Sequence, residues 1–388
     1  MRPPCVRMAN LIYSKARKEY AKMAIPKKCK VSVLEAPKKM VLKEVAIPAL
    51  GPDEILVKVE GCGVCGTDVH EYKGDPFGYC PVQLGHEGTG EIVALGKNVK
   101  VDFTGKPLKV GDKIVTGLKP CGKCDTCRFH PEIMELCNGG EIFGLLPGPK
   151  HYLNGWFGEY MKVNKGGVVF NVSDMDRDLR ILIEPAAVIV HAVEQAKQIF
   201  NFQFNSYVLV QGCGPIGLLL LAMVRCLGVR NIIACDGDEK RLAFAKKLGA
   251  KYTVNGLKPG AIEKVKSLTG GEGAEMVFQC TGSPKAASVA WKYVRRGGSF
   301  CELGFFTNNG DTTYSPHLDM CNKQIKACGS WTYQAKDWVQ AFDCLKASKE
   351  RKLPITKLIT HKYPLEKMNE AMEMNISMKG LKIAYVAK

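Results

Sequence analysis

The fold is decided by residues 207–217, which read YVLVQGCGPIG. An apolar, strand-like run precedes the pattern G-x-G-x-x-G at Gly212, Gly214 and Gly217, and an apolar helical run opens with Pro215 and Ile216. Such glycines permit a tight turn, close approach of the backbone to a pyrophosphate and tight helix–strand packing. The helix N-terminus adds free N–H donors for phosphates. This context predicts a dinucleotide site; the alternative is a glycine-rich turn at the surface.

An acidic residue follows at the spacing that such a site requires. Asp236 ends the next strand-like run, 19 residues after Gly217. A carboxylate there accepts hydrogen bonds from the ribose hydroxyls of NAD and repels the extra phosphate of NADP. Lys240 and Arg241 are the counter-argument, since nearby cations accommodate a 2′-phosphate. We predict NAD as the cofactor, and the predicted cofactor-binding set also includes Arg241 and Thr281.

Strands and helices alternate regularly from Asn205 onward. A helix ends near Gly228, another is capped by Asp238, and a third is predicted over 284–295. The strands are predicted at 207–210, 231–235, 252–255, 275–279 and 299–303. This alternation predicts an α/β fold with a Rossmann-type, doubly wound parallel sheet.

The segments on either side of this region have a different pattern of apolar and turn residues. From Cys29 to about Ile183, short alternating runs such as 55–59 are separated by Gly, Pro and Asp turns, which predicts a β-rich domain. The last 60 or so residues lose the alternation and are expected to fold back onto that domain. The predicted division is a basic extension over 1–28, a catalytic domain over 29–186 with 329–388 returning to it, and a nucleotide-binding domain over 187–328.

Four cysteines follow metal-ligand spacing, with two residues between successive members and then nine before the last. They are Cys121, Cys124, Cys127 and Cys137. Four thiols within 17 residues surround one tetrahedral ion, and Zn²⁺ is the usual occupant. A redox C-x-x-C pair is the alternative, but it expects a thioredoxin-like βαβ setting that is absent here. We predict a structural zinc site.

A second, mixed set of ligands suggests an open metal site. Cys65 lies in the run GVCGTDVH at 63–70, His86 and Glu87 follow another turn, and Glu184 opens a helix near the domain boundary. A thiolate, an imidazole and a carboxylate hold Zn²⁺ with one position free for water or substrate. The ion then lowers the pKa of a bound alcohol or polarises a carbonyl. Taken singly, each residue has an ordinary alternative as a buried thiol, a satisfied histidine or a surface acid.

Two further residues near Cys65 suit proton transfer. A hydroxyl at Thr67 beside the metal takes the proton of the substrate, and an imidazole at His70 passes it to solvent. The alternative is that both are turn residues that satisfy backbone groups.

Composition limits the class of protein. The chain has 388 residues with 46% hydrophobic and 24% charged residues, which suits two globular domains. No apolar run approaches the roughly 20 residues of a membrane span. The formal charge of +17 comes from scattered lysines without a nucleic-acid-binding signature, so neither a nucleic acid nor a membrane partner is expected. The 17 cysteines are odd in number and follow no secretory signal, which favours reduced cytosol and a cytoplasmic protein.

With these motifs, some 360 residues of the chain resemble the zinc-containing medium-chain dehydrogenase/reductase family. The specific elements are the runs at 63–70 and 85–88, the four-cysteine lobe and the turn at 212–217. The resemblance implies a GroES-like catalytic domain, Cys65 and His86 as catalytic-zinc ligands, and hydride transfer between a substrate carbon and nicotinamide C4. It also implies that Thr67 and His70 form a proton relay through the cofactor ribose. The last cysteine interval departs from the family, which usually has seven residues there.

Glu184 narrows the resemblance. Alcohol dehydrogenases of this family usually carry a cysteine near this point, whereas Glu184-Pro185 resembles the branch of sorbitol, threonine, glucose and polyol dehydrogenases. In that branch Glu87 also approaches the metal, directly or through water. We therefore predict a zinc enzyme that oxidises a secondary alcohol of a polyol, sugar or cyclitol with NAD. The alternatives are a threonine-type or simple secondary-alcohol dehydrogenase, and a non-catalytic nucleotide-binding protein. A homodimer or homotetramer is implied.

Overall fold

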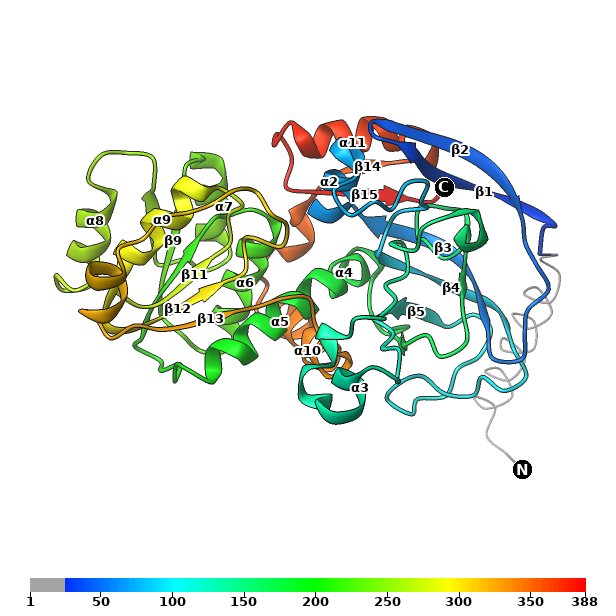
Figure 1. Ribbon diagram of the computed structural model, residues 1–388, viewed down its shortest axis with the longest axis horizontal. Helices are drawn as coiled ribbons and strands as arrows, with labels where there is room; N and C mark the ends of the chain where they lie inside the picture. The colour runs from blue at the N-terminus through cyan, green and yellow to red at the C-terminus, as the bar shows by residue number, and fades with distance from the viewer. Residues whose placement is uncertain (1–24) are drawn as a thin grey trace, which may run out of the picture.

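The computed structural model describes residues 25–388, so the predicted basic extension lies largely outside the described residues. Figure 1 shows two bodies side by side, joined by helices between them. One is built on a six-stranded sheet in the order β10-β9-β8-β11-β12-β13, in which every neighbouring pair is parallel. Its strands are β8 (Tyr207–Gln211), β9 (Asn231–Asp236), β10 (Tyr252–Asn255), β11 (Ala274–Gln279), β12 (Val294–Glu302) and β13 (Lys326–Gly329).

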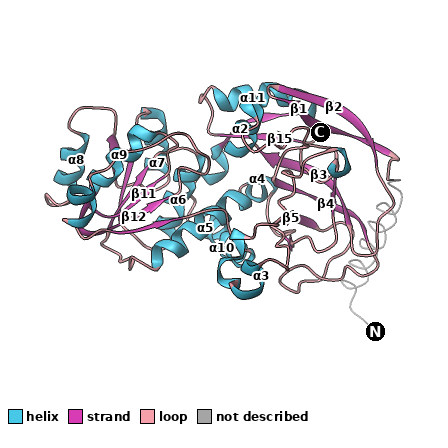
Figure 2. Ribbon diagram, viewed as in Figure 1, coloured by secondary structure: helices cyan, strands magenta, loops and turns pink. Residues whose placement is uncertain are grey.

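Both faces of this sheet are covered by helices, as Figure 2 shows in cyan against magenta. Successive residues of β8 alternate between two cores: Val208 and Val210 pack on one side and Leu209 on the other. Residues buried on both faces explain why these strands read as continuous apolar runs. The covering helices are α6 (Pro215–Cys226), α7 (Glu239–Lys247), α8 (Ala261–Leu268) and α9 (Pro284–Tyr293). The predicted doubly wound parallel sheet is confirmed.

The other body is β-rich and contains both ends of the described chain. Its main sheet has the order β14-β15-β3-β4-β5-β7, and β6 also pairs with β3. The C-terminal strand β15 runs antiparallel to β3, with Ala384 opposite Gly63. A separate hairpin is formed by β1 and β2. These strands are β1 (Lys28–Ala36), β2 (Lys39–Ala46), β3 (Ile55–Gly63), β4 (Glu87–Leu95), β5 (Lys113–Thr116), β6 (Tyr160–Val163), β7 (Val169–Asn171), β14 (Ile359–Tyr363) and β15 (Lys382–Val386).

Two long helices lie between the sheets and pack on each other, α5 (Ile183–Lys197) and α10 (Ala335–Glu350). His191 of α5 is buried between two carboxylates. Its Nδ1 lies 2.9 Å from Asp337 Oδ2 of α10, and its Nε2 lies 3.4 Å from Glu135 Oε1 of the four-cysteine lobe. This buried polar cluster therefore joins three segments that are far apart in the sequence.

Shorter helices complete the described chain. The α-helices are α2 (Gly66–Gly74), α3 (Asp125–Phe129), α4 (Arg177–Ile181) and α11 (Met368–Ile376). The 3₁₀ helices are η1 (Pro131–Leu136), η2 (Pro149–His151), η4 (Ile355–Leu358) and η5 (Leu365–Lys367), and η3 (Pro316–Cys321) is a π-helix. Among residues 25–388, no helix combines the length and the apolar character that crossing a bilayer requires.

Candidate metal centres and cofactor site

Cys65, His86 and Glu87 converge at one point. Each offers a ligand atom, and these atoms all lie within 4.8 Å of one another. Cys65 follows β3 and caps the N-terminus of α2. Glu87 is the first residue of β4, and the antiparallel register places it opposite Gly63. A Cβ at Gly63 would lie 2.0 Å from Glu87 Oε2, so the glycine leaves the space that this carboxylate occupies.

Asp68 ties the two ligand-bearing turns together. Its carboxylate accepts hydrogen bonds from the backbone N–H of Cys65, at 2.8 Å, and of Gly85, at 3.2 Å. Asp68 Oδ1 also lies 3.5 Å from His86 Nδ1. A histidine whose Nδ1 faces a carboxylate presents Nε2 to a metal. Burial lowers the pKa of His86, but the Asp68 carboxylate and the Cys65 thiol together raise it well above its usual value.

Glu87 is paired with a buried cation. Lys382, at the start of β15, donates from Nζ to Glu87 Oε1 and also to the carbonyl of Val64, at 3.2 Å. Burial lowers the pKa of Lys382, but Glu87 and Cys65 raise it by more. The net pKa therefore lies above its usual value, so the cation persists at neutral pH. Glu87 Oε2 has no hydrogen-bond partner among residues 25–388. An unpartnered buried carboxylate oxygen beside a thiol and an imidazole fits a metal ligand.

Glu184 lies near this group without joining it. The atoms within 4.8 Å of one another do not include Glu184, the second residue of α5. Burial raises the pKa of Glu184 to about 7, although the charges of His86 and Lys382 and a hydrogen bond from Tyr333 oppose the shift. Glu184 thus shares the electrostatic environment of the three ligands.

The predicted relay residues lie on a helix instead of a turn. Thr67 and His70 are three residues apart in α2, so their side chains share a face. Thr67 Oγ1 is 3.8 Å from Cys65 Sγ. The His70 ring meets Phe306, which follows β12, edge to face at a centroid distance of 5.3 Å. Burial, and to a smaller extent Lys73, lowers the pKa of His70, which favours a neutral imidazole that accepts protons.

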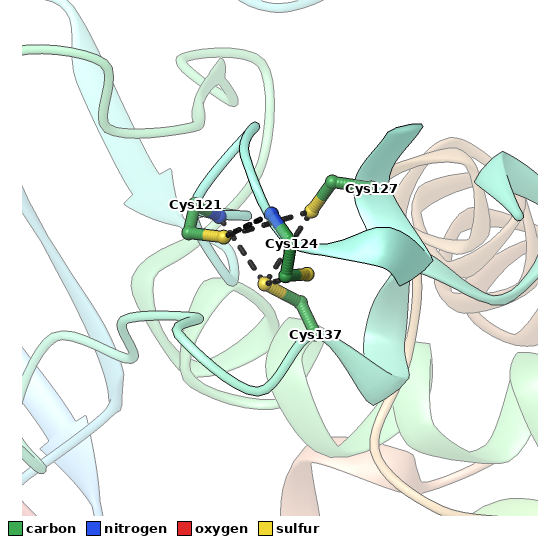
Figure 3. A group of neighbouring side chains, drawn as sticks. All are labelled: Cys121, Cys124, Cys127 and Cys137. Atoms are coloured by element: carbon green, nitrogen blue, oxygen red, sulfur yellow. Dashed lines mark hydrogen bonds between the residues drawn. The ribbon is translucent and has the colours of Figure 1, made fainter. Parts of the chain in front are cut away.

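The four predicted zinc-lobe cysteines also come together, with their side chains pointing toward one another (Figure 3). Three of their sulfur–sulfur distances are 3.4, 3.6 and 4.0 Å. A tetrahedral ion with Zn–S bonds of about 2.3 Å requires sulfur atoms about 3.8 Å apart, so the cluster has the right size. Backbone N–H groups of Lys123 and Cys124 lower the pKa of Cys121 to about 6, which favours the thiolate. The nine residues between Cys127 and Cys137 contain the end of α3 and the whole of η1.

The glycine-rich turn between β8 and α6 has the geometry that a pyrophosphate needs. Gly212 has φ +92°, which favours glycine. A Cβ at Gly217 would lie 1.8 Å from the carbonyl oxygen of Gly212, so helix and turn meet closely there. A Cβ at Gly214 would meet no described atom within 4 Å, which leaves open space over the turn. Pro215 and Ile216 begin α6, whose N-terminus therefore faces this space.

Asp236 lies against the same turn. Its Oδ2 accepts from the backbone N–H of Cys213, at 2.6 Å, and its Oδ1 from that of Asp238, at 2.8 Å. Thr281 follows β11 and approaches the turn, since its Cγ2 would lie 2.6 Å from a Cβ at Gly212. Arg241 points elsewhere: its guanidinium donates to the carbonyl of Met378 at 3.3 Å. Of these predicted cofactor residues, Asp236 and Thr281 lie at the turn. Arg241 instead contacts the segment after α11.

Sequence reasoning missed three residues of the metal centre: Asp68, Lys382 and Tyr333. Asp68 was within reach, because it stands three residues after Cys65 and carboxylates commonly accept from the N-terminal turn of a helix. Lys382 and Tyr333 carried no local signal, because they reach the centre only through the pairing of β15 with β3 and the packing near α10.

Comparison with known proteins shows which family has this architecture. A family model described as an alcohol dehydrogenase GroES-like domain matches residues 51–174, and one described as a zinc-binding dehydrogenase matches residues 215–347. Sorbitol dehydrogenase of Bacillus subtilis is 29% identical over 364 residues, which cover 92% of this chain and 96% of that protein. L-threonine 3-dehydrogenase of Symbiobacterium thermophilum is 31% identical over 359 residues, covering 91% and 96%.

Among solved structures, an alcohol dehydrogenase of Thermotoga maritima has a TM-score of 0.85 at 29% identity. The match covers 93% of this chain and all of that one. The chain belongs to the zinc-containing medium-chain dehydrogenase/reductase family. The predicted family and the GroES-like plus Rossmann fold class are confirmed.

Proposed function

We propose that the protein is a zinc-dependent dehydrogenase that transfers a hydride between NAD and the secondary alcohol or ketone of a polyol, sugar or cyclitol. The observation that carries this proposal is the convergence of Cys65, His86 and Glu87 within 4.8 Å. Sulfur, imidazole and carboxylate form a donor set typical of catalytic zinc. The family and its named dehydrogenases support the reaction type.

The chain's own residues provide the binding and proton-transfer steps. Zinc, when bound, supplies Lewis-acid polarisation of the substrate oxygen, and NAD, when bound, supplies the hydride acceptor. Cys65, His86 and Glu87 would hold the ion, with Glu184 beside them. The Thr67 hydroxyl takes the substrate proton, and His70 passes it to solvent from the same face of α2. Cys121, Cys124, Cys127 and Cys137 would hold a second, structural zinc, giving two ions per chain.

The cofactor is proposed to be NAD because Asp236 lies at the glycine-rich turn, where its negative charge repels a 2′-phosphate. Arg241, one of the two cations that could accommodate a 2′-phosphate, donates to the carbonyl of Met378 in this structure. We place the enzyme in the cytoplasm, as a homodimer or homotetramer with a small alcohol or ketone as its substrate.

The substrate class has two supported candidates. Glu184-Pro185 and the similarity to sorbitol dehydrogenase favour a polyol. The similarity to L-threonine 3-dehydrogenase, at 31% identity, favours an amino alcohol such as L-threonine. A panel with NAD or NADP that contains polyols, cyclitols, L-threonine and simple secondary alcohols separates them. The highest kcat/KM is expected for a polyol or cyclitol with NAD.

Metal analysis of a ligand variant tests the site itself. We expect two zinc ions per wild-type chain and one in Cys65→Ser, which should lose turnover and still bind NADH. Cys321→Ser, a change at an exposed thiol, is the matched control and should keep both ions and full activity. Turnover retained by Cys65→Ser when its zinc content is halved would refute the proposed centre.

A further inference from the structure

Outside the metal sites, two cysteines face each other across a helix pair. Cys226 is the last residue of α6, and Cys344 lies in α10, which packs on α6. Cys226 Sγ is 3.5 Å from Ser348 Oγ. Because Ser348 follows Cys344 by one helical turn, both residues share the face of α10 that meets Cys226. Each thiol shifts the pKa of the other, and neither is fully buried.

Cationic groups surround Cys226. The Arg351 guanidinium donates to the carbonyl of Cys226 at 3.4 Å, and Arg225 precedes Cys226 in the chain. The interaction with Cys344 lowers the pKa of Cys226 most. The hydrogen bond with Ser348 and the charges of the two arginines lower it further. The net pKa is about 6, although partial burial raises it. The pKa of Cys344 is raised by its interaction with Cys226 and by burial. The pair thus consists of a nucleophilic thiolate and a protonated thiol.

A second cysteine pair, on strands β12 and β13, provides a comparison for the charges around Cys226. Cys301 and Cys328 are directly opposite each other on β12 and β13, and their interaction lowers the pKa of Cys328 and raises that of Cys301. Cys301 is completely buried in the sheet, and no cation lowers the pKa of Cys328. Peroxides react with accessible thiolates next to cations. Cys226 therefore differs from Cys328 in the arginine charges beside it, whereas both thiols are half-buried.

We propose that Cys226 and Cys344 form a peroxide-oxidisable dithiol that closes to a disulfide. The Cys226 thiolate attacks one oxygen of hydrogen peroxide, the O–O bond breaks, and a sulfenic acid and hydroxide form. The Cys344 sulfur then attacks the Cys226 sulfur, the S–O bond breaks, and water leaves. In sum, two thiols lose two electrons and two protons, and one peroxide becomes two waters. The bond would join the helix that begins at the cofactor turn to a helix that packs on α5.

Mass spectrometry of the zinc-loaded, full-length enzyme tests this assignment. The enzyme is treated with a small molar excess of hydrogen peroxide, remaining thiols are blocked with N-ethylmaleimide, and peptides are mapped without reduction. We expect a Cys226–Cys344 crosslink that dithiothreitol removes, formed before the four zinc-lobe cysteines are oxidised. In Cys344→Ser, dimedone should trap a sulfenic acid on Cys226. In Cys226→Ser, oxidation of Cys344 should fall at least tenfold.

Cys328→Ser is the matched control, because it removes one thiol of the pair without a neighbouring cation and should leave the crosslink unchanged. Three results would overturn the proposal. They are the absence of a Cys226–Cys344 crosslink in the wild type, a crosslink confined to Cys301–Cys328, and oxidation of the zinc-lobe cysteines before Cys226. The wild-type map decides the matter even where a variant fails to fold.

Discussion

Lys382 and Glu87 form a buried ion pair at the proposed catalytic centre, although 295 residues separate them. One carboxylate oxygen faces the lysine, and the other has no partner among the described residues. Removing one member of a buried pair costs about 3 to 5 kcal/mol, because the other charge is left uncompensated. A bound zinc ion would offer Glu87 a second cation.

Lys382→Met should therefore destabilise the metal-free protein more than the zinc-loaded protein. We expect a loss of about 3 kcal/mol in the free energy of unfolding without zinc and a clearly smaller loss with it. Urea unfolding with and without a chelator measures both values. Lys382→Arg keeps the charge and should lose less in each state. Equal losses with and without zinc would show that Glu87 does not face the ion.

The carboxylate of Asp68 should control how tightly His86 binds zinc. Groups that orient a metal-binding histidine typically contribute tenfold to a hundredfold in affinity. Asp68→Asn keeps the size of the side chain but removes the charge beside His86 Nδ1, so the zinc affinity of this site should fall within that range. Competition with a chelating dye measures the dissociation constant. Asp311→Asn, at an exposed position, should change nothing. An unchanged affinity in Asp68→Asn would remove Asp68 from the centre.

Asp236 and Asp238 separate cofactor choice from helix stability. Asp236→Ser should lower kcat/KM with NAD about tenfold and raise it with NADP, because the repelling charge at the ribose is gone. Asp238 caps α7 by accepting from the N–H groups of Lys240 and Arg241. Asp238→Ala should cost about 1 kcal/mol of stability and leave the NAD/NADP ratio unchanged. Steady-state kinetics with both cofactors checks this, and an unaltered ratio in Asp236→Ser contradicts the assignment.

The buried cluster at His191 should stabilise the junction between the two bodies. Without the imidazole, Asp337 and Glu135 lose a shared partner while they stay buried. His191→Ala is therefore expected to lower the free energy of unfolding by about 3 kcal/mol. Gln198→Ala, an exposed change at the C-cap of the same helix, should cost less than about 0.5 kcal/mol. Urea unfolding of both variants is the measurement; a cost below 1 kcal/mol for His191→Ala would exclude this role.

Local patterns in the sequence predicted the nucleotide-binding half well, because its strands are continuous apolar runs followed by turns that only glycine accommodates. The end of the helix over 284–295 and the start of β12 were less accurate. The helix ends at Tyr293, and β12 begins at Val294, five residues before the predicted strand. Arg295 and Arg296 made that stretch look too polar for a central strand.

The candidate metal centre was readable only where its residues share a motif. Cys65, His86 and Glu87 belong to two short runs that the antiparallel pairing of β3 and β4 brings together. Glu184 was noticed because it opens a helix near the domain boundary, and the resemblance then assigned it to the metal; in the structure it lies outside the group of ligand atoms within 4.8 Å of one another. Lys382 belongs to a strand whose contacts are all long-range, so no periodicity or motif in its neighbourhood pointed to the site.

The thiolate at Cys226 should be visible in the pH dependence of alkylation. With a pKa of about 6, the thiolate outnumbers the thiol about tenfold at pH 7, and the rate should fall roughly tenfold from its plateau by pH 5. Cys344→Ala removes the interaction that lowers this pKa most, so the midpoint should move upward and the rate at pH 7 should drop. Ser348→Ala removes a weaker hydrogen bond and should move it less. Iodoacetamide labelling of the Cys226 peptide, followed by mass spectrometry, gives the profiles. A wild-type midpoint near 9, the value of an ordinary thiol, would mean that Cys344 and the arginines do not activate Cys226.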